Sequence, residues 1–200
     1  MQGKIVYFED LKPENTDVTL SLVKERAAAL GIGKVVLAST TGATARKALA
    51  FFQGIRLIVV PHQFDFKRKE NPFPRDLVTT LRDAGHDVHF GTMLFHTGDF
   101  YGSTAPTVMA NLLRCFSQGM KVCFEIVLMA ADAGLVTGGE KVVAVAGTGR
   151  GADTALVMQA ASSQHLGKLR VNEILAKPLN PLNIEEVLER SAQGGTVGEA

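Results

Sequence analysis

The stretch KVVLASTTGATARKALAFFQGIRLIVV, residues 34–60, decides the fold. Two short runs of β-branched and aliphatic residues, Lys34–Ala38 and Leu57–Val60, flank a helical pattern from Ala43 to Phe52. Short strands that alternate with helices are typical of a parallel sheet. The second run is almost continuous in apolar residues, which indicates a strand covered by helices on both faces. The stretch therefore predicts a strand–helix–strand unit of an α/β protein.

The same alternation continues toward both ends of the chain. Further strands are predicted at Ile5–Phe8, Val88–Gly91, Lys141–Ala146 and Leu169–Ala176. Further helices are predicted at Asp17–Leu30, Pro74–Ala84, Asp153–Ser162 and Ile184–Arg190, with two consecutive helices in Thr104–Val136 that meet at Gln118 and Gly119. Thr16 or Asp17 would cap the first helix, and Gly31 would end it. The pattern predicts a three-layer α/β/α sandwich with a mainly parallel sheet, in which residues 1–190 form a single domain and residues 191–200 a flexible tail.

Composition narrows the classes of function. Hydrophobic residues make up 46% of the chain, which is enough for a full core, and 21 Lys and Arg nearly balance 20 Asp and Glu. A net charge of +1 gives no reason to expect nucleic-acid or membrane-surface binding. The longest apolar run, Ile126–Ala131, is far too short to span a membrane. Cys115 and Cys123 form no disulfide framework and no metal-ligand pattern, so we expect a cytoplasmic protein without a metal site.

The loop that follows the predicted strand Lys34–Ala38 and leads into the next helix is the first candidate site. It consists of Ser39, Thr40, Thr41, Gly42, Ala43 and Thr44. Free backbone N–H groups at a helix N-terminus, together with hydroxyl donors, form a cradle for a phosphate, and Gly42 would let the anion approach the backbone. The string also fits the S/T-x-T-G-x-T phosphate loop of flavodoxins. Ser and Thr are favoured as helix caps as well, so a cap without a ligand is the alternative.

The second candidate is the glycine-rich loop after the predicted strand Lys141–Ala146. Its candidate ligand-binding residues are Gly147, Thr148, Gly149, Arg150, Gly151, Asp153 and Thr154. With Ala152 the loop matches G-x-G-x-x-A, the dinucleotide fingerprint, and Glu173 lies about where a ribose-binding acid belongs. The match is weak, because a dinucleotide-binding domain opens with this turn and here only one predicted strand follows. Lining a ligand pocket without binding a pyrophosphate is the alternative.

Two histidines follow other predicted strands. His62 comes directly after Leu57–Val60, and His96 lies in the glycine- and aromatic-rich segment Gly91–Gly102, which also holds Asp99 and Tyr101. Such a segment is either a mobile lid or a wall for a flat ring. The histidines are candidates to line the site or to act in catalysis, although a loop histidine is more often only hydrogen-bonded. The sequence assigns no catalytic residue.

A further pair of acids occurs in the apolar helix that follows Gln118. Glu125 and Asp132 are seven residues apart, so both carboxylates fall on one helix face. A solvent-facing stripe is one interpretation. The other is a buried acid pair held by backbone N–H groups or by Arg150.

Four strings resemble a known family. They are Asn15-Thr16, ASTTGATA (Ala38–Ala45), GMKVCFEIVLMAADAG (Gly119–Gly134) and AGTGRGADTA (Ala146–Ala155). Together they resemble uncharacterised prokaryotic, largely archaeal, proteins that are grouped with the C-terminal α/β domain of pyruvate kinase. The resemblance implies a stand-alone α/β domain with FMN as its ligand. In pyruvate kinase the similar domain carries an allosteric sugar-phosphate site, whose Ser/Thr-Gly loop would correspond to Ser39–Thr44.

These observations favour one function and leave two alternatives. The favoured function is an FMN-binding protein that could act as a flavin-dependent enzyme, with the phosphate at Ser39–Thr44 and the ring near His62 and His96. No pyruvate kinase activity is expected, because 200 residues cannot hold the (β/α)8 catalytic domain. The first alternative is a non-catalytic sugar-phosphate or nucleotide sensor that uses the same loop. The second is a homo-oligomeric module with an interface in the apolar region Leu112–Val136.

Overall fold

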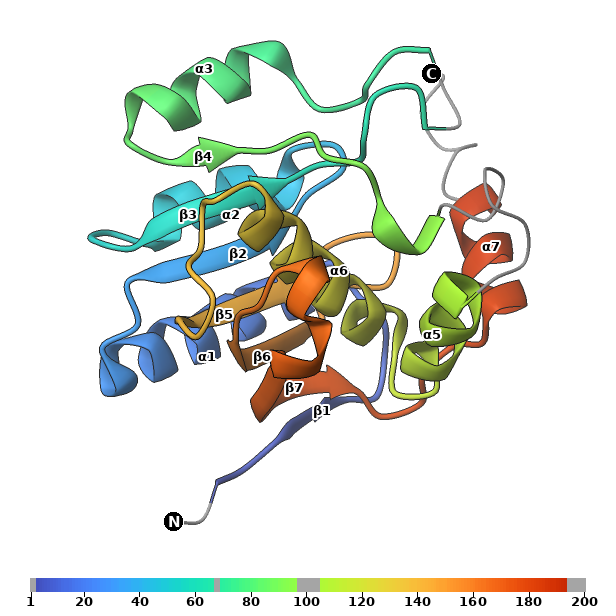
Figure 1. The fold of residues 1–200 in the computed structure, drawn as a ribbon. Helices are drawn as coiled ribbons and strands as arrows, with labels where there is room; N and C mark the ends of the chain where they lie inside the picture. The colour runs from blue at the N-terminus through green and yellow to red at the C-terminus, as the bar shows by residue number, and fades with distance from the viewer. Residues whose placement is uncertain (1–2, 67–68, 97–104, 194–200) are drawn as a thin grey trace.

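The computed structural model describes residues 3–66, 69–96 and 105–193 (Figure 1). The strands are β1 (Val6–Phe8), β2 (Lys34–Ala38), β3 (Arg56–Val60), β4 (Asp87–Val88), β5 (Lys141–Ala146), β6 (Thr154–Gln159) and β7 (Arg170–Pro178). The helices are α1 (Asn15–Leu30), α2 (Ala43–Phe51), α3 (Arg75–Asp83), α5 (Ala105–Arg114), α6 (Gln118–Asp132) and α7 (Ile184–Gln193), with short 3₁₀ turns at Leu94–His96 and Ser163–Lys168. Residues 194–200 of the predicted tail lie outside the described part.

The strands form one seven-stranded sheet in the order β1-β7-β6-β5-β2-β3-β4. Every neighbouring pair is parallel except the two that involve β6, which runs antiparallel to β5 and to β7. The carboxyl ends of β2, β3 and β5 therefore meet at one edge of the sheet, next to the beginning of β6. We call this the carboxyl edge.

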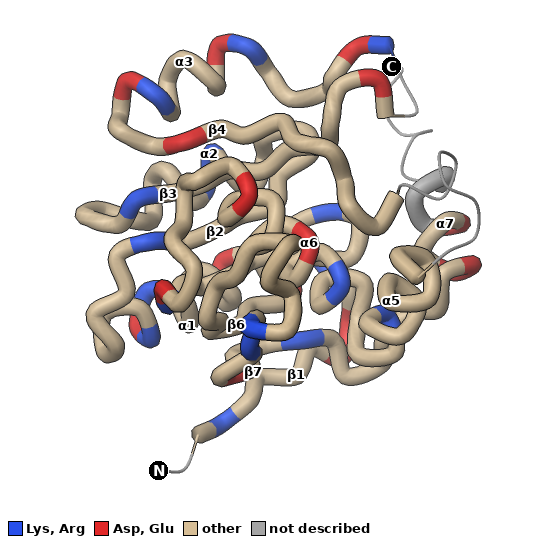
Figure 2. The backbone as a smooth tube through the Cα atoms, in the orientation of Figure 1, with Lys and Arg blue, Asp and Glu red and all other residues tan. Residues whose placement is uncertain are grey.

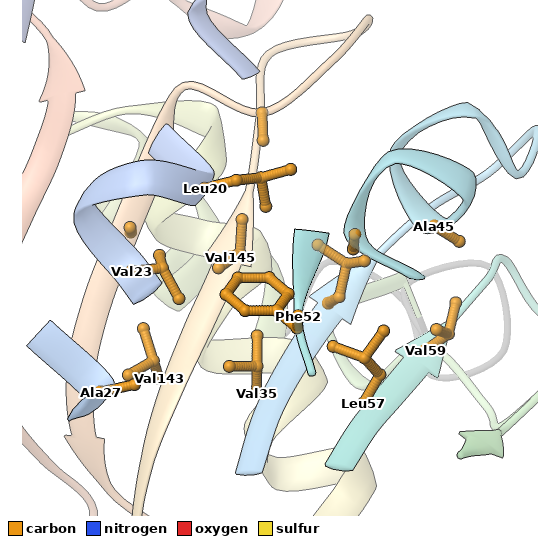
Figure 3. Packing of buried hydrophobic residues seen from close by; sticks show 14 of the residues in the cluster. Leu20, Val23, Ala27, Val35, Ala45, Phe52, Leu57, Val59, Val143 and Val145 are labelled. Atoms are coloured by element: carbon orange, nitrogen blue, oxygen red, sulfur yellow. The ribbon is translucent and has the colours of Figure 1, made fainter. Parts of the chain in front are cut away.

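Helices cover both faces of the sheet, so the predicted three-layer sandwich with a mainly parallel sheet is confirmed (Figure 1). α1, α2 and α3 pack on one face, where Leu20, Val23 and Ala45 contact side chains of β2, β3 and β5 (Figure 3). α6 packs on the other face. Alternate residues of each central strand enter the two cores: Val35 and Leu37 face α1 and α2, while Val36 faces α6. This two-sided burial explains the continuous apolar runs of the sequence.

The predicted helix Asp153–Ser162 is wrong, because residues 154–159 form strand β6. Ala, Leu, Met and Gln favour helices in isolation, but tertiary context overrides propensity in so short a segment. In the sheet, Ala155 and Val157 enter the core under α1, and Leu156 and Met158 enter the core under α6. The glycine-rich loop is thus the turn of a β5–β6 hairpin.

Two predicted helix boundaries also differ. The first helix begins at Asn15, so the predicted caps Thr16 and Asp17 lie inside it, and the N-cap residue Glu14 forms no side-chain cap. The hydroxyl of Thr16 accepts the N–H of Ala152. α6 begins at Gln118, and the hydroxyl of Ser117 caps it by accepting the N–H of Met120 at 2.9 Å. The break between α5 and α6 therefore precedes Gln118. Gly31 ends α1 as predicted, in a left-handed conformation.

The region predicted as an interface divides into two parts. α6 is largely buried against the sheet, whereas Val108, Leu112 and Phe116 on and after α5 are exposed. Among the described residues, no helix combines the length and apolar character needed to cross a bilayer. The same residues contain no cluster of three or more side chains suited to holding a metal ion, and both cysteines are free thiols.

Gly119 permits the close approach of α6 to β6. A Cβ at this position would lie 2.6 Å from the Cβ of Thr154 and 3.1 Å from Oδ1 of Asp153. Helix propensity predicts that Gly119→Ala stabilises the protein, but this contact predicts a loss of about 1–3 kcal/mol in the free energy of unfolding. Urea unfolding of Gly119→Ala measures the loss. Gly138→Ala, at a position with open space, is the matched control and should change little; equal stability of the two variants would contradict the prediction.

Candidate functional site

The strand order places a topological switch point between β2 and β5. From β2 the chain passes through α2 to β3 and then outward to β4, and it returns through α5 and α6 to β5 on the other side of β2. α2 and α6 lie on opposite faces of the sheet. In open α/β sheets, ligands bind at such a point, beyond the carboxyl ends of the strands. The two loops singled out in the sequence, Ser39–Thr44 and Gly147–Thr154, follow these two adjacent strands.

The Ser39–Thr44 loop presents unused hydrogen-bond donors at the N-terminus of α2. Within the described residues, nothing accepts the backbone N–H of Gly42, Ala43 or Thr44. The hydroxyl of Thr44 is buried, with 7% of the residue exposed, and also has no partner among them. Buried hydroxyl groups normally have a hydrogen-bond partner. The N-terminus of a helix also favours an anion, so these donors suit a phosphate.

The other hydroxyls of this loop are engaged within the protein. Ser39 is buried, and its Oγ accepts the N–H of Ala45 at 3.2 Å, so it caps the first turn of α2. Oγ1 of Thr40 lies 3.3 Å from Nε2 of His62. Thr41 is exposed. The cap thus comes from Ser39, while the N–H groups without an acceptor belong to other residues of the same loop.

Gly42 has a packing role that the sequence did not predict. Its φ of 85° is in the left-handed region, and a Cβ there would lie 2.7 Å from Cδ2 of Leu77 and 3.1 Å from Cδ of Pro74. A side chain at this position would therefore meet α3. The absence of a side chain lets α3 pack beneath the loop, and any substitution would disturb this packing whether or not a ligand binds.

The Gly147–Thr154 turn satisfies most of its own polar groups. The N–H of Thr148 donates to Oδ2 of Asp153 at 2.8 Å, and the N–H of Asp153 donates to the carbonyl of Ala146 at 3.1 Å. The hydroxyl of Thr154 donates to Oδ1 of Asp153 at 2.7 Å and lies 3.2 Å from Oγ of Ser117. This buried network joins the turn to the N-terminus of α6. Gly149 and Arg150 are exposed at its tip.

The dinucleotide fingerprint in this turn is a wrong interpretation. The fingerprint requires a helix after the glycines, and here a strand follows. Ala152 is held by α1 instead: its N–H donates to Thr16 and its carbonyl accepts from Thr19. Glu173 forms an ion pair with Arg26 of α1 at 2.7 Å, so it is not placed as a ribose-binding acid.

The two candidate histidines lie on either side of one aromatic ring. The ring centroid of Phe66 is 5.0 Å from that of His62 and 5.1 Å from that of His96, edge to face in both cases. His62 also contacts Thr40, so this row of rings begins beside the Ser39–Thr44 loop. The remainder of the predicted lid, with Asp99 and Tyr101, lies outside the described residues.

A buried ion pair ends the row of rings. The side chain of Lys121 is 0% exposed and that of Glu125 is 2% exposed, and Nζ of Lys121 lies 2.5 Å from Oε2 of Glu125. Oε1 of Glu125 accepts the N–H of Phe95 at 2.8 Å and lies 3.4 Å from Nδ1 of His96. Nζ of Lys121 is 3.3 Å from the same His96 nitrogen. The pair therefore fixes the 3₁₀ turn that carries His96.

Burial and ion pairing shift the pKa values of Glu125 and Lys121 in opposite directions. Burial raises the pKa of Glu125, but the hydrogen bond from His96 and the charge and hydrogen bond of Lys121 together outweigh it and lower the pKa to about 2. Burial lowers the pKa of Lys121, and Glu125 offsets part of this effect. Glu125 is therefore a carboxylate at neutral pH, facing the amine of Lys121.

The sequence predicted one member of this cluster and missed another. Glu125 is buried and held by a backbone N–H, as one interpretation expected, but its charged partner is Lys121 and not Arg150. Asp132 is exposed and accepts the N–H of Ser163 at 2.7 Å, so the two acids do not form a pair. The signal for Lys121 was its spacing: a lysine four residues before a glutamate in an apolar helix.

The ion pair predicts a specific pH dependence of stability. The pKa of Glu125 is about 2 in the folded state against 4.5 in the unfolded chain, so its contribution is complete well above pH 4.5 and is lost as the pH falls toward 2. Glu125→Gln should lower the free energy of unfolding by about 3–5 kcal/mol at pH 7, because it leaves Lys121 buried without its partner. By pH 3 the difference from wild type should shrink by about 2 kcal/mol.

Urea unfolding of the wild-type protein and of the Glu125→Gln variant at pH 3, 5 and 7 tests this prediction. Asp132→Asn, which removes an exposed carboxylate from the same helix, is the control and should give a constant small difference. If Glu125→Gln does not fold, the double variant Lys121→Met/Glu125→Leu should recover much of the stability, because it buries no unpaired charge. A pH-independent effect of Glu125→Gln would show that the carboxylate is not ionised in the folded protein.

Comparison with known proteins agrees with this fold. Residues 17–158 match the family described as pyruvate kinase, alpha/beta domain. Among solved structures, a pyruvate kinase from Cryptosporidium parvum is similar with 14% identity and a TM-score of 0.42 over 77% of this chain, and the C. parvum pyruvate kinase in complex with ADP with 15% identity and a TM-score of 0.36 over 69%. This chain covers 24% and 21% of those two proteins. Because the family match extends over well over half of the residues, the chain belongs to the pyruvate kinase alpha/beta domain family.

Proposed function

We propose that this protein binds a phosphate-bearing small molecule at the carboxyl edge, that the ligand is FMN, and that the chain has no pyruvate kinase activity. The observation that carries the proposal is the set of unused donors at the N-terminus of α2: the N–H groups of Gly42, Ala43 and Thr44 and the buried hydroxyl of Thr44. FMN is the member of this ligand class that the sequence resemblance implies.

The phosphate would lie against the first turn of α2. The three N–H groups would donate to its oxygens, and the positive end of the helix dipole would add a favourable interaction. The exposed hydroxyl of Thr41 is available as a further donor. Ser39 would act indirectly, because its hydroxyl already caps Ala45 and so holds the turn in shape.

The flavin ring would lie beside the row formed by His62, Phe66 and His96. Flat rings pack favourably against aromatic side chains, and the chain has no Trp and only two Tyr, so Phe and His rings are the main partners available. Glu125 and Lys121 hold His96 in place, and Thr40 contacts His62. FMN would supply hydride or electron transfer, while these residues would bind and orient it.

A sugar-phosphate or nucleotide sensor is the alternative function. It would use the same N–H groups, and the engagement of both histidines by neighbouring side chains favours it over catalysis. Flavin absorbance of the purified protein separates the two. Self-association through Val108, Leu112 and Phe116 is compatible with either, because these side chains leave an apolar surface exposed.

The first prediction concerns ligand preference. A phosphate held by several charge-assisted hydrogen bonds, each worth about 1.5–3 kcal/mol, should make FMN bind more than about tenfold tighter than riboflavin. Calorimetric titration of the ligand-free protein with both compounds measures the ratio, and one FMN is expected per chain. Equal affinities would mean that the phosphate does not contact this loop.

The second prediction separates a phosphate cradle from a simple helix cap. Ala43 is exposed at the first position of α2. An aspartate there should raise stability by about 0.3–1 kcal/mol through the helix dipole, yet repel a phosphate and weaken FMN binding more than about tenfold. Thermal melting and calorimetry on Ala43→Asp test both effects.

The matched control is Ala50→Asp, at an exposed position near the other end of α2. The same charge there opposes the dipole, so this variant should lose stability and keep FMN affinity. A folded Ala43→Asp protein with wild-type FMN affinity would refute the proposed phosphate position.

A further inference from the structure

A surface cavity of about 650 Å³ lies beside α3, away from the Ser39–Thr44 loop. Its walls come from the segment after β3, from one side of α3 and from Phe90, which lies two residues after β4. We call it the α3 groove. The face of α3 that packs on Gly42 carries Leu77, whereas the face toward the groove carries Arg75, Val78 and Arg82. Ligand pockets of about 300–1,000 Å³ are typical for small molecules, so the groove has a suitable size.

Three phenylalanine rings form the apolar part of the groove. Phe73 is buried, and its ring centroid lies 6.1 Å from that of Phe90. The centroid of Phe64 lies 4.8 Å from that of Phe90, and 59% of Phe64 is exposed. An exposed phenylalanine next to two further rings presents aromatic surface to whatever occupies the groove.

The polar part of the groove carries an excess of positive charge. Arg75 and Arg82 lie seven residues apart, two turns along the same side of α3, and Lys69 also lines the groove, against one acid, Glu70. α3 itself carries basic and acidic residues near both of its ends (Figure 2). Within the described ranges, neither arginine forms an ion pair. Two of the acids near α3 are engaged elsewhere, because Asp76 pairs with Arg46 and Asp87 pairs with Arg56.

Asn71 links described parts of the wall that lies between β3 and α3. Nδ2 of Asn71 donates to the carbonyls of His62 and Gln63 at 2.8 and 3.4 Å, and Oδ1 of Asn71 accepts the N–H of Phe73 at 3.0 Å. These bonds tie the residues directly after β3 to Phe73, which lies two residues before α3. Phe73 and Asn71, both part of the groove, are thus held relative to the end of β3.

We propose that the α3 groove binds a planar aromatic anion, with the ring against Phe64 and Phe90 and the anionic group at Arg75 and Arg82. The aromatic rings select a flat apolar body, and guanidinium groups suit a carboxylate, sulfonate or phosphate because they can donate two parallel hydrogen bonds. No residue of the Ser39–Thr44 loop lines the groove, so this site differs from the proposed FMN phosphate position.

The test uses 8-anilinonaphthalene-1-sulfonate, whose fluorescence rises in apolar surroundings, together with its uncharged analogue N-phenyl-1-naphthylamine. Fluorescence titration of the wild-type protein should give saturable binding of one sulfonate per chain. The double variant Arg75→Gln/Arg82→Gln should weaken it at least about tenfold while leaving the affinity for the uncharged analogue unchanged. Phe64→Ala should weaken both probes at least about fivefold.

Matched controls replace the same residue types elsewhere. Phe116→Ala removes another exposed phenylalanine, and Arg170→Gln removes another exposed arginine; neither residue lines the groove, and both variants should bind as wild type does. Thermal melting checks that every variant is folded. Absence of saturable binding, unchanged affinity in the groove variants, or loss of binding in Phe116→Ala would overturn the proposal.

FMN is itself a planar aromatic anion, so competition distinguishes the two sites. If FMN leaves the sulfonate bound, and Ala43→Asp weakens only FMN, both proposals stand. If FMN displaces the sulfonate and Ala43→Asp has no effect on FMN, the groove is the flavin site and the proposed phosphate position is wrong. If FMN binds as proposed but the sulfonate does not bind, only the groove proposal fails.

Discussion

The pairing of β2 with β5 is the constraint on which the rest of the structure depends. Val35, Val36 and Leu37 lie opposite Val143, Ala144 and Val145, and all six residues are fully buried. Because both faces of these strands are covered, polar groups can only gather where the strands end. At this pairing the order in which the strands are added to the sheet reverses. The connections that carry α2 and α6 therefore cover opposite faces of the sheet. The interior of the fold and the position of the candidate site are therefore set by one strand pair.

The ion pair of Lys121 and Glu125 is the main departure from this apolar interior. Replacing a buried ion pair by apolar residues is often neutral or stabilising, so the pair is poorly explained as a source of stability. What it does achieve is geometric: one carboxylate holds the N–H of Phe95 and contacts His96, and the lysine contacts the same imidazole. An apolar pair would remove these contacts with Phe95 and His96. The cluster is better explained by the position of His96 than by the stability of α6.

The sequence predicted best the strands that are buried on both faces. It predicted worst the segments whose structure is determined by contacts between residues far apart in the chain. Lys34–Ala38 and Lys141–Ala146 are strands with the predicted bounds, because short runs that are rich in β-branched valine favour a buried strand over a helix. Thr154–Gln159 was mistaken for a helix, because its residues also suit a helix and only the pairing with β5 and β7 makes it a strand. In the site, the Ser39–Thr44 loop could be identified from its residue types. The separate roles of Ser39 and Gly42 in this loop could not be predicted. The contacts of Gly42 with α3 join segments more than thirty residues apart in the sequence.

The packing of α3 against Gly42 also determines which residue caps α2. Position 42 is the N-cap of α2, where a serine, threonine or aspartate side chain would normally accept an N–H of the first turn. Leu77 and Pro74 leave no room for such a side chain, so residue 42 is a glycine and the cap comes from Ser39, three residues earlier. Ser39 reaches the N–H of Ala45 and leaves those of Ala43 and Thr44 without a partner among the described residues. The close packing of α3 thus leaves Ser39, and not residue 42, to cap the first turn of α2, and the N–H groups of Ala43 and Thr44 have no acceptor among the described residues.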